Sequence, residues 1–156
     1  DVMMSAKGLG GGMPIGACLA TAEAAKGMTA GTHGSTFGGN PLATAVGNAV
    51  MDVMLEPGFL DGVDRVARDL WHRLQELAPR HPQVIQEVRG AGLMLGIRCR
   101  DSVTNADLGA ALRAHGLLTV PAADNVVRLL PPLVIDESHV REAVDMIDAG
   151  CRRIAG

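Results

Sequence analysis

The chain opens with Asp1–Gly16, DVMMSAKGLGGGMPIG, and this stretch decides how the rest is interpreted. Lys7 ends a short apolar run and is followed by glycine at four of the next five positions. Glycines leave room for a bulky group to approach the backbone. A lysine in a partly dry pocket loses its proton more easily than one in water, and its neutral amine then attacks carbonyl compounds. From the spacing alone, Lys7 is either such a nucleophile or an incidental lysine in a flexible surface loop.

The known phosphate loops do not fit this stretch. A Walker A loop needs its lysine after the glycines and followed by Ser or Thr, whereas Lys7 precedes them. The dinucleotide fingerprint also fails, because counting from Gly8 and Gly10 places Met13 where the third glycine is required. The glycines therefore do not indicate a nucleotide cradle.

Four blocks of the chain together resemble one family. Ala6–Ala17 resembles the cofactor-lysine motif of the class III aminotransferases, which depend on pyridoxal 5′-phosphate (PLP). Thr32–Ala43, THGSTFGGNPLA, resembles their phosphate-contacting loop, and Val88–Ile97, VRGAGLMLGI, resembles their small-domain strand signature. Val127–Ile135, VRLLPPLVI, resembles the segment that carries a substrate-carboxylate arginine. The blocks stand in the family's order and cover nearly the whole chain.

The resemblance implies an α/β fold, the C-terminal portion of a fold type I PLP-dependent transferase. Residues 1–57 would be the C-terminal part of the PLP-binding large domain, and residues 58–156 the small C-terminal domain. Family members are much longer than 156 residues, so the chain is expected to be the C-terminal part of a longer protein, a fragment inactive by itself. The carboxylate that pairs with the pyridine nitrogen and the aromatic ring that stacks on it lie upstream in the family.

Four residues match positions with a known role in the family. Lys7 would hold the cofactor covalently and move a proton during catalysis. Thr36 would bind the cofactor phosphate of the other subunit, and Ser35 would contact substrate. Arg128 would bind a substrate carboxylate, since a guanidinium suits a bidentate contact. The plainer alternatives are an ordinary loop threonine, a turn serine, and an arginine in a structural ion pair.

The function implied is transfer of a terminal amine. Within the family, the closest resemblance is to members that move the δ-amine of N-acetylornithine to 2-oxoglutarate in arginine biosynthesis, working as homodimers with shared active sites. The alternatives are another ω-aminotransferase, acting on ornithine, succinylornithine, succinyldiaminopimelate or 4-aminobutyrate, and a non-catalytic fragment with a structural role.

Composition excludes several other classes. The net charge of −3 argues against a nucleic-acid binder, and 2% aromatic residues without tyrosine leave no platform on which bases stack. The three cysteines form no metal-ligand spacing, so no metal is expected, and their odd number fits a reducing, cytoplasmic compartment. The uncharged stretch 27–51 is rich in Gly, Thr and Asn and would make a poor membrane span.

Local patterns predict interleaved strands and helices, typical of α/β or α+β proteins. The expected strands are 2–5, which we take as buried, 15–21, 84–88, 93–99, 117–120 and 126–130, with a turn over 89–92. The expected helices are one turn at 22–27, then 41–55 after the cap Asn40, 59–78, 105–115, and 137–154 after the cap Asp136.

Overall fold

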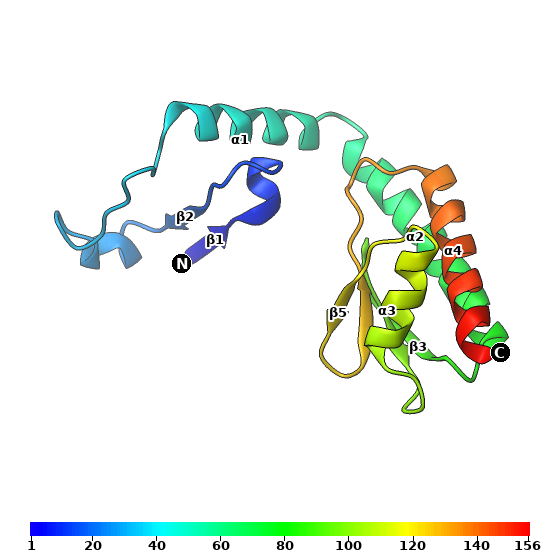
Figure 1. Ribbon diagram of the computed structural model, residues 1–156. Coiled ribbons are helices and arrows are strands. Elements are labelled where there is room, and N and C mark those ends of the chain that lie inside the picture. Colours follow the sequence, from blue (N-terminus) through cyan, green and yellow to red (C-terminus); the bar gives the residue numbers. More distant parts are fainter. The chain divides into compact units, whose positions relative to one another are not determined.

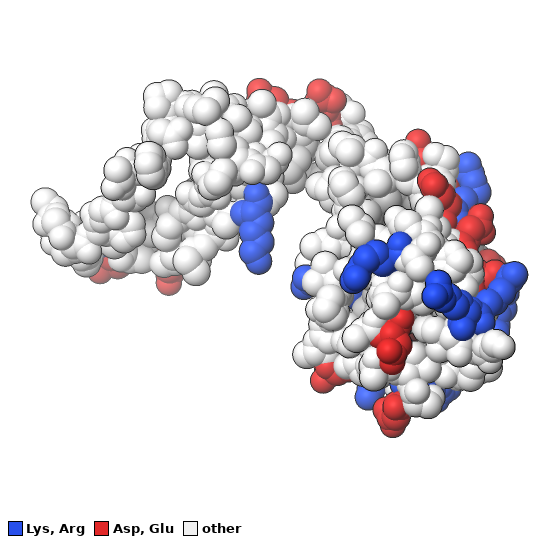
Figure 2. Space-filling view, in the orientation of Figure 1, with Lys and Arg blue, Asp and Glu red and all other residues white.

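The computed structural model describes residues 1–156, which form two compact units, Asp1–Leu60 and Asp61–Gly156. Figure 1 shows the order of their helices and strands. The two units differ in composition at the surface: Figure 2 shows the part formed by the first unit almost entirely white, while charged side chains gather on the second. No helix of the structure combines the length and the apolar character needed to cross a bilayer.

The first unit contains a two-stranded antiparallel sheet and one long helix. Strand β1 (Val2–Ser5) pairs with β2 (Ala17–Ala20), and the 3-10 helix η1 (Lys7–Gly10) begins the connection between them. The strands are confirmed, but the expected burial of residues 2–5 is wrong, since all four are exposed. Two short strands and one helix offer too few elements to cover both faces of a sheet.

Helix α1 (Pro41–Met54) begins as its sequence predicts. Asn40 is the N-cap and its Oδ1 accepts from the backbone N–H of Ala43 at 2.9 Å, with Pro41 in the first turn. The helix lies against the connection that follows Lys7. A Cβ atom at Gly47 would lie 3.7 Å from both Ile15 Cδ1 and the Leu9 carbonyl oxygen. Before α1, the expected turn of helix is the 3-10 helix η2 (Ala24–Gly27).

The second unit is a four-stranded antiparallel sheet packed with three helices. Its strands are β3 (Ile85–Ala91), β4 (Met94–Cys99), β5 (Val120–Ala122) and β6 (Val126–Leu129), in the spatial order β3-β4-β6-β5. Its helices are α2 (Phe59–Leu77), α3 (Asn105–Ala114) and α4 (Glu137–Ala155), with the short 3-10 helix η3 (Ala78–Arg80) after α2. This mixed helix and sheet architecture agrees with the fold class expected from the sequence, and the antiparallel pairing makes this unit α+β in detail.

Two local predictions in this unit need correction. The turn expected over residues 89–92 is shorter, because β3 continues to Ala91 and the chain reverses at Gly92, whose φ is +56°. The strand expected over 117–120 is instead β5, which begins at Val120. In both places the pairing partner across the sheet, and not the local residue type, decides where the strand lies.

One face of the sheet forms the core. Leu95, Ile97 and Cys99 of β4 are at most 1% exposed and pack with Val127 of β6 and the apolar side of α2, including Leu74. The amphipathic pattern of residues 59–78 therefore predicts the buried side of α2 correctly. Burial raises the pKa of Cys99 to about 11 and that of Cys151 to about 12, so both thiols stay protonated and act as apolar core groups.

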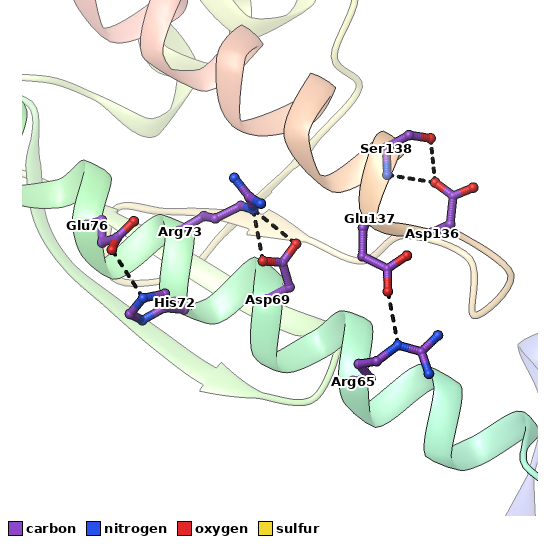
Figure 3. A network of polar contacts seen from close by, with 8 residues as sticks. All are labelled: Arg65, Asp69, His72, Arg73, Glu76, Asp136, Glu137 and Ser138. Carbon is purple, nitrogen blue, oxygen red and sulfur yellow. Dashed lines mark hydrogen bonds and ion pairs between the residues drawn. The ribbon is translucent and has the colours of Figure 1, made fainter.

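Polar contacts hold α4 at both ends. At its start, Asp136 caps the helix by accepting from the N–H groups of Ser138 and His139, and Glu137 accepts from Arg65 of α2 at 3.0 Å (Figure 3). Toward its end, Asp148 lies 2.5 Å from Nε2 of His81, the one buried polar residue of the chain.

The Asp148 carboxyl group contacts three basic side chains. Burial by itself would raise its pKa, but the contacts with His81, Arg152 and Arg80 outweigh burial and lower the pKa below its ordinary value. The carboxylate form is thus stabilised by folding, and α4 is tied to the segment that follows α2.

Candidate functional site

Lys7 lies at the junction of β1 and η1 in an unusual backbone conformation. Its φ is +56°, in the left-handed region that lysine rarely adopts, and only Asp124 and Asn125 share this property among non-glycine residues. The side chain is exposed and forms no ion pair or hydrogen bond within the chain. Residues held in such conformations cluster at functional sites, where the surrounding structure imposes them.

The glycines after Lys7 serve two purposes. Gly10 and Gly11 permit close packing, because an added Cβ would lie 2.7 Å from Ile15 Cγ2 and 3.0 Å from Val50 Cγ2 of α1, respectively. Gly8 and Gly12 have no atom within 4 Å of that position, so the backbone on either side of this packed pair borders open space. The glycine-rich loop after Lys7 therefore packs on α1. The backbone next to Lys7 remains accessible.

The loop with Ser35 and Thr36 leads directly into α1. Asn40 fixes the end of the loop, since its Nδ2 donates to the Phe37 carbonyl at 2.8 Å while its Oδ1 caps the helix. A Cβ at Gly38 would lie 3.0 Å from Ser35 Cβ, so this loop folds tightly upon itself. The hydroxyls of Ser35 and Thr36 are exposed and neither forms a hydrogen bond within the chain.

The functional groups of Lys7, Ser35 and Thr36 are suited to bind a cofactor that carries an aldehyde and a phosphate. An exposed primary amine beside open backbone suits covalent attachment of a carbonyl, and unpaired hydroxyls in a glycine-rich loop suit a phosphate. No hydrogen bond or ion pair joins the Lys7 amine to Ser35 or Thr36 within the chain. No group of three His, Cys, Asp or Glu side chains is arranged to hold a metal ion.

Arg128 belongs to the second unit and lies on the sheet face opposite the core. It pairs with Gly96 of β4 and with Val120 of β5. Its Nε is buried without a hydrogen-bond partner, and its guanidinium forms no ion pair in the chain. Arg128 also borders a mostly apolar cavity of about 420 Å³, whose other lining includes Leu70, Leu129 and Val140 of the core side. A buried, unpaired guanidinium atom favours an anionic partner.

Sequence reasoning missed Arg98, which carries the other unpartnered buried Nε of the chain. Arg98 lies on the same sheet face as Arg128, because Gly96 and Arg98 are two residues apart on β4. The signal was present as the alternation of Gly96, Ile97 and Arg98, in which Ile97 faces the core. Without the strand register, however, nothing linked Arg98 to Arg128.

Residues 1–150 match the family model described as aminotransferase class-III. A protein named acetylornithine aminotransferase from Mesorhizobium japonicum is 55% identical over 155 residues, which is 99% of this chain and 38% of that protein. The chain thus spans well under half the length of such curated relatives.

Solved structures of aminotransferases also match nearly the whole chain. An acetylornithine aminotransferase from Elizabethkingia anophelis matches with a TM-score of 0.87 and 34% identity, over 98% of this chain and 41% of that one. An ornithine aminotransferase from Toxoplasma gondii matches with a TM-score of 0.89 and 31% identity, over 99% of this chain and 37% of that one.

Proposed function

The chain belongs to the class III aminotransferases, a PLP-dependent family, and we propose that the complete enzyme to which it belongs transfers the terminal amine of N-acetylornithine to 2-oxoglutarate. The observation that carries the proposal is 55% identity to a relative named acetylornithine aminotransferase across nearly the whole chain. Such a reaction would serve arginine biosynthesis. The cytoplasm, expected from the cysteine content, is the proposed compartment, and all three cysteines are free.

PLP supplies an aldehyde that links covalently to amines and a ring that accepts electrons from the carbon next to nitrogen. In the proposed mechanism, Lys7 holds the cofactor through its amine. Lys7 has a left-handed backbone just after β1, and no atom lies within 4 Å of where a Cβ at Gly8 would be, so the backbone beside Lys7 would leave room for the bound cofactor. Once a substrate amine has displaced it, the freed Lys7 amine would be the base that moves a proton at the substrate carbon.

The other three residues bind and orient. Thr36 donates its hydroxyl to the cofactor phosphate of the partner subunit in a homodimer, and Ser35 contacts the substrate. Their free hydroxyls and the hydrogen bonds by which Asn40 joins the end of their loop to α1 support these roles. Arg128 binds a substrate carboxylate, supported by its unpaired guanidinium. We further propose that residues 1–57 belong to the PLP-binding large domain and residues 58–156 to the small domain.

Ornithine is the second candidate amino donor, because ornithine aminotransferase structures match the chain with TM-scores as high as the acetylornithine enzyme does. The two donors differ at the α-amine, which is charged in ornithine and acylated in N-acetylornithine. Parallel assays of the complete enzyme with both donors separate the candidates, and a higher kcat/KM for ornithine would reject the first.

The covalent role of Lys7 has a direct test, since Lys7 and Lys26 are the only lysines of the chain. Borohydride reduction of the enzyme with PLP, followed by peptide mass mapping, should leave the pyridoxyl group on Lys7. Lys26, exposed and paired with Glu23, is the built-in control. The Lys7→Ala variant should lose nearly all turnover while Lys26→Ala keeps it. A label on Lys26, or turnover by Lys7→Ala, would reject the proposal.

A further inference from the structure

The outer face of the second unit's sheet, opposite the core, carries three arginines on three different strands. Arg89, Gly96 and Arg128 stand in one row across β3, β4 and β6, and Arg98 stands in the next row beside Glu87. Paired residues of an antiparallel sheet share a face, so all these side chains project from the same surface. The residues that alternate with them, such as Ile97 and Val127, are buried in the core.

Both acidic groups at this face form ion pairs with arginines, Glu87 with two of them and Asp124 with one. Glu87 lies between Arg89 and Arg98, with N–O distances of 3.7 and 3.8 Å. Asp124, in the turn between β5 and β6, is 3.1 Å from Arg89. Arg128 has no acidic partner. The positive charge left over on this face therefore resides on Arg128.

Gly96 makes this arrangement possible. Arg89 is on β3 and Asp124 is in the turn that joins β5 to β6, so the Arg89 side chain extends over β4 to reach it. A Cβ at Gly96 would lie 3.8 Å from Arg89 Cγ and only 2.8 Å from Val126 Cγ1. The bare backbone at Gly96 thus provides the surface along which Arg89 lies.

We propose that Arg89 and Arg98 are positioning residues that neutralise Asp124 and Glu87, and so keep Arg128 available for the carboxylate of a substrate. This proposal rests on the proposed role of Arg128 in binding a substrate carboxylate. It adds to the proposed function two residues, Arg89 and Arg98, that do not touch substrate. An arginine next to a free carboxylate pairs with it, and a competing internal carboxylate weakens binding of an external one.

Removing the positive charge of Arg98 should weaken carboxylate binding at Arg128, because Glu87 is then less well neutralised. In Arg98→Gln, Glu87 keeps only Arg89, which is already shared with Asp124. An uncompensated negative charge on the same half-exposed face should lower the affinity of Arg128 for a carboxylate by roughly three- to fivefold. Glu87→Gln added to Arg98→Gln removes the uncompensated carboxylate and should restore the affinity to within about twofold of wild type.

The test is an NMR titration of the 156-residue chain with glutarate, followed at the arginine Nε–Hε signals at low ionic strength. The expected result is a glutarate-dependent shift at Arg128, weakened in Arg98→Gln and restored in the double variant, with the difference fading at high salt. Arg68→Gln on α2 is the matched control, since it removes the same charge from an exposed arginine without an ion pair and should not change the affinity.

Three results would overturn the proposal. If Arg98→Gln binds glutarate as tightly as wild type, the Glu87 carboxylate does not compete with glutarate for Arg128. Failure of the added Glu87→Gln to restore affinity assigns Arg98 a direct contact instead. Absence of any shift at Arg128 shows that Arg128 does not bind a carboxylate. The proposed PLP linkage at Lys7 is tested separately, by the borohydride reduction.

Discussion

Lys7 differs from Lys26, the other lysine of the chain, in its left-handed backbone and in having no ion pair. A left-handed conformation costs a non-glycine residue roughly 1–2 kcal/mol, and here neither an ion pair nor a hydrogen bond of the side chain offsets it. The conformation is imposed by the packing of the following loop, where Gly10 meets Ile15 and Gly11 meets Val50. Local strain and an unengaged amine at one residue support the proposed covalent role of Lys7.

Thr36→Ala in the complete enzyme should weaken PLP binding about ten- to hundredfold. One hydrogen bond to a charged group contributes roughly 1.5–3 kcal/mol, which corresponds to that change in affinity. Thr36→Ser keeps the hydroxyl and should bind PLP nearly as wild type does. Spectrophotometric PLP titration of the three proteins measures the effect, and equal affinity of Thr36→Ala and wild type would remove Thr36 from the phosphate site.

At the scale of elements, the β5–β6 hairpin is joined to the rest of the second unit by two asparagines. Asn125 donates from Nδ2 to the carbonyls of Val103 and Arg100, and its Oδ1 accepts from the N–H of Asn105 at 2.7 Å. Asn105 in turn donates to the carbonyls of Ala122 and Val126. This network connects the hairpin to the start of α3 and satisfies several backbone carbonyls in the loops around it.

Asn125→Ala should destabilise the second unit more than Asn125→Gly does. Both changes remove the side-chain hydrogen bonds, at a cost of about 1–3 kcal/mol. Only alanine adds the cost of holding a side chain at φ +56°, roughly 1 kcal/mol more. Urea unfolding followed by Trp71 fluorescence measures both differences. Equal stabilities of the two variants would show that the hairpin relaxes to a different turn.

At the scale of the whole molecule, the two units differ in how much they bury. In residues 1–60 only Gly10, Ala43 and Gly47 are buried, whereas the second unit has a continuous core drawn from its sheet and helices. Large apolar side chains such as Met4, Phe37 and Leu42 are exposed in the first unit. Surfaces of this kind are typical of regions that contact other protein segments.

Hydrogen exchange should therefore distinguish the units in the isolated chain. The amides of β1 and β2, in an exposed two-stranded sheet, should exchange much faster than those of β4 and β6. Strand β4 is paired on both sides and its core residues are fully buried, so its amides should exchange only by global opening of the second unit. Peptide-level mass spectrometry gives both rates, and equal protection would contradict this division.

Several features of this protein are determined by the sequence because they depend on neighbours along the chain. The start of α1 at Asn40-Pro41, the cap at Asp136 and the buried side of α2 all follow from local hydrogen bonding or from helical spacing, and all agree with the structure. The family is also readable from four motifs, because each preserves residue types at fixed separations, and the comparisons confirm it.

Other features are decided only by the tertiary structure. The strand order β3-β4-β6-β5 and its register place Arg89, Arg98 and Arg128 on one face, although up to 39 positions separate them in the sequence. The exposure of β1 and the left-handed backbone at Lys7 likewise depend on how many elements pack nearby and on where the glycine loop meets α1. Strand pairing and packing join residues distant in sequence, and no local propensity encodes which of them meet.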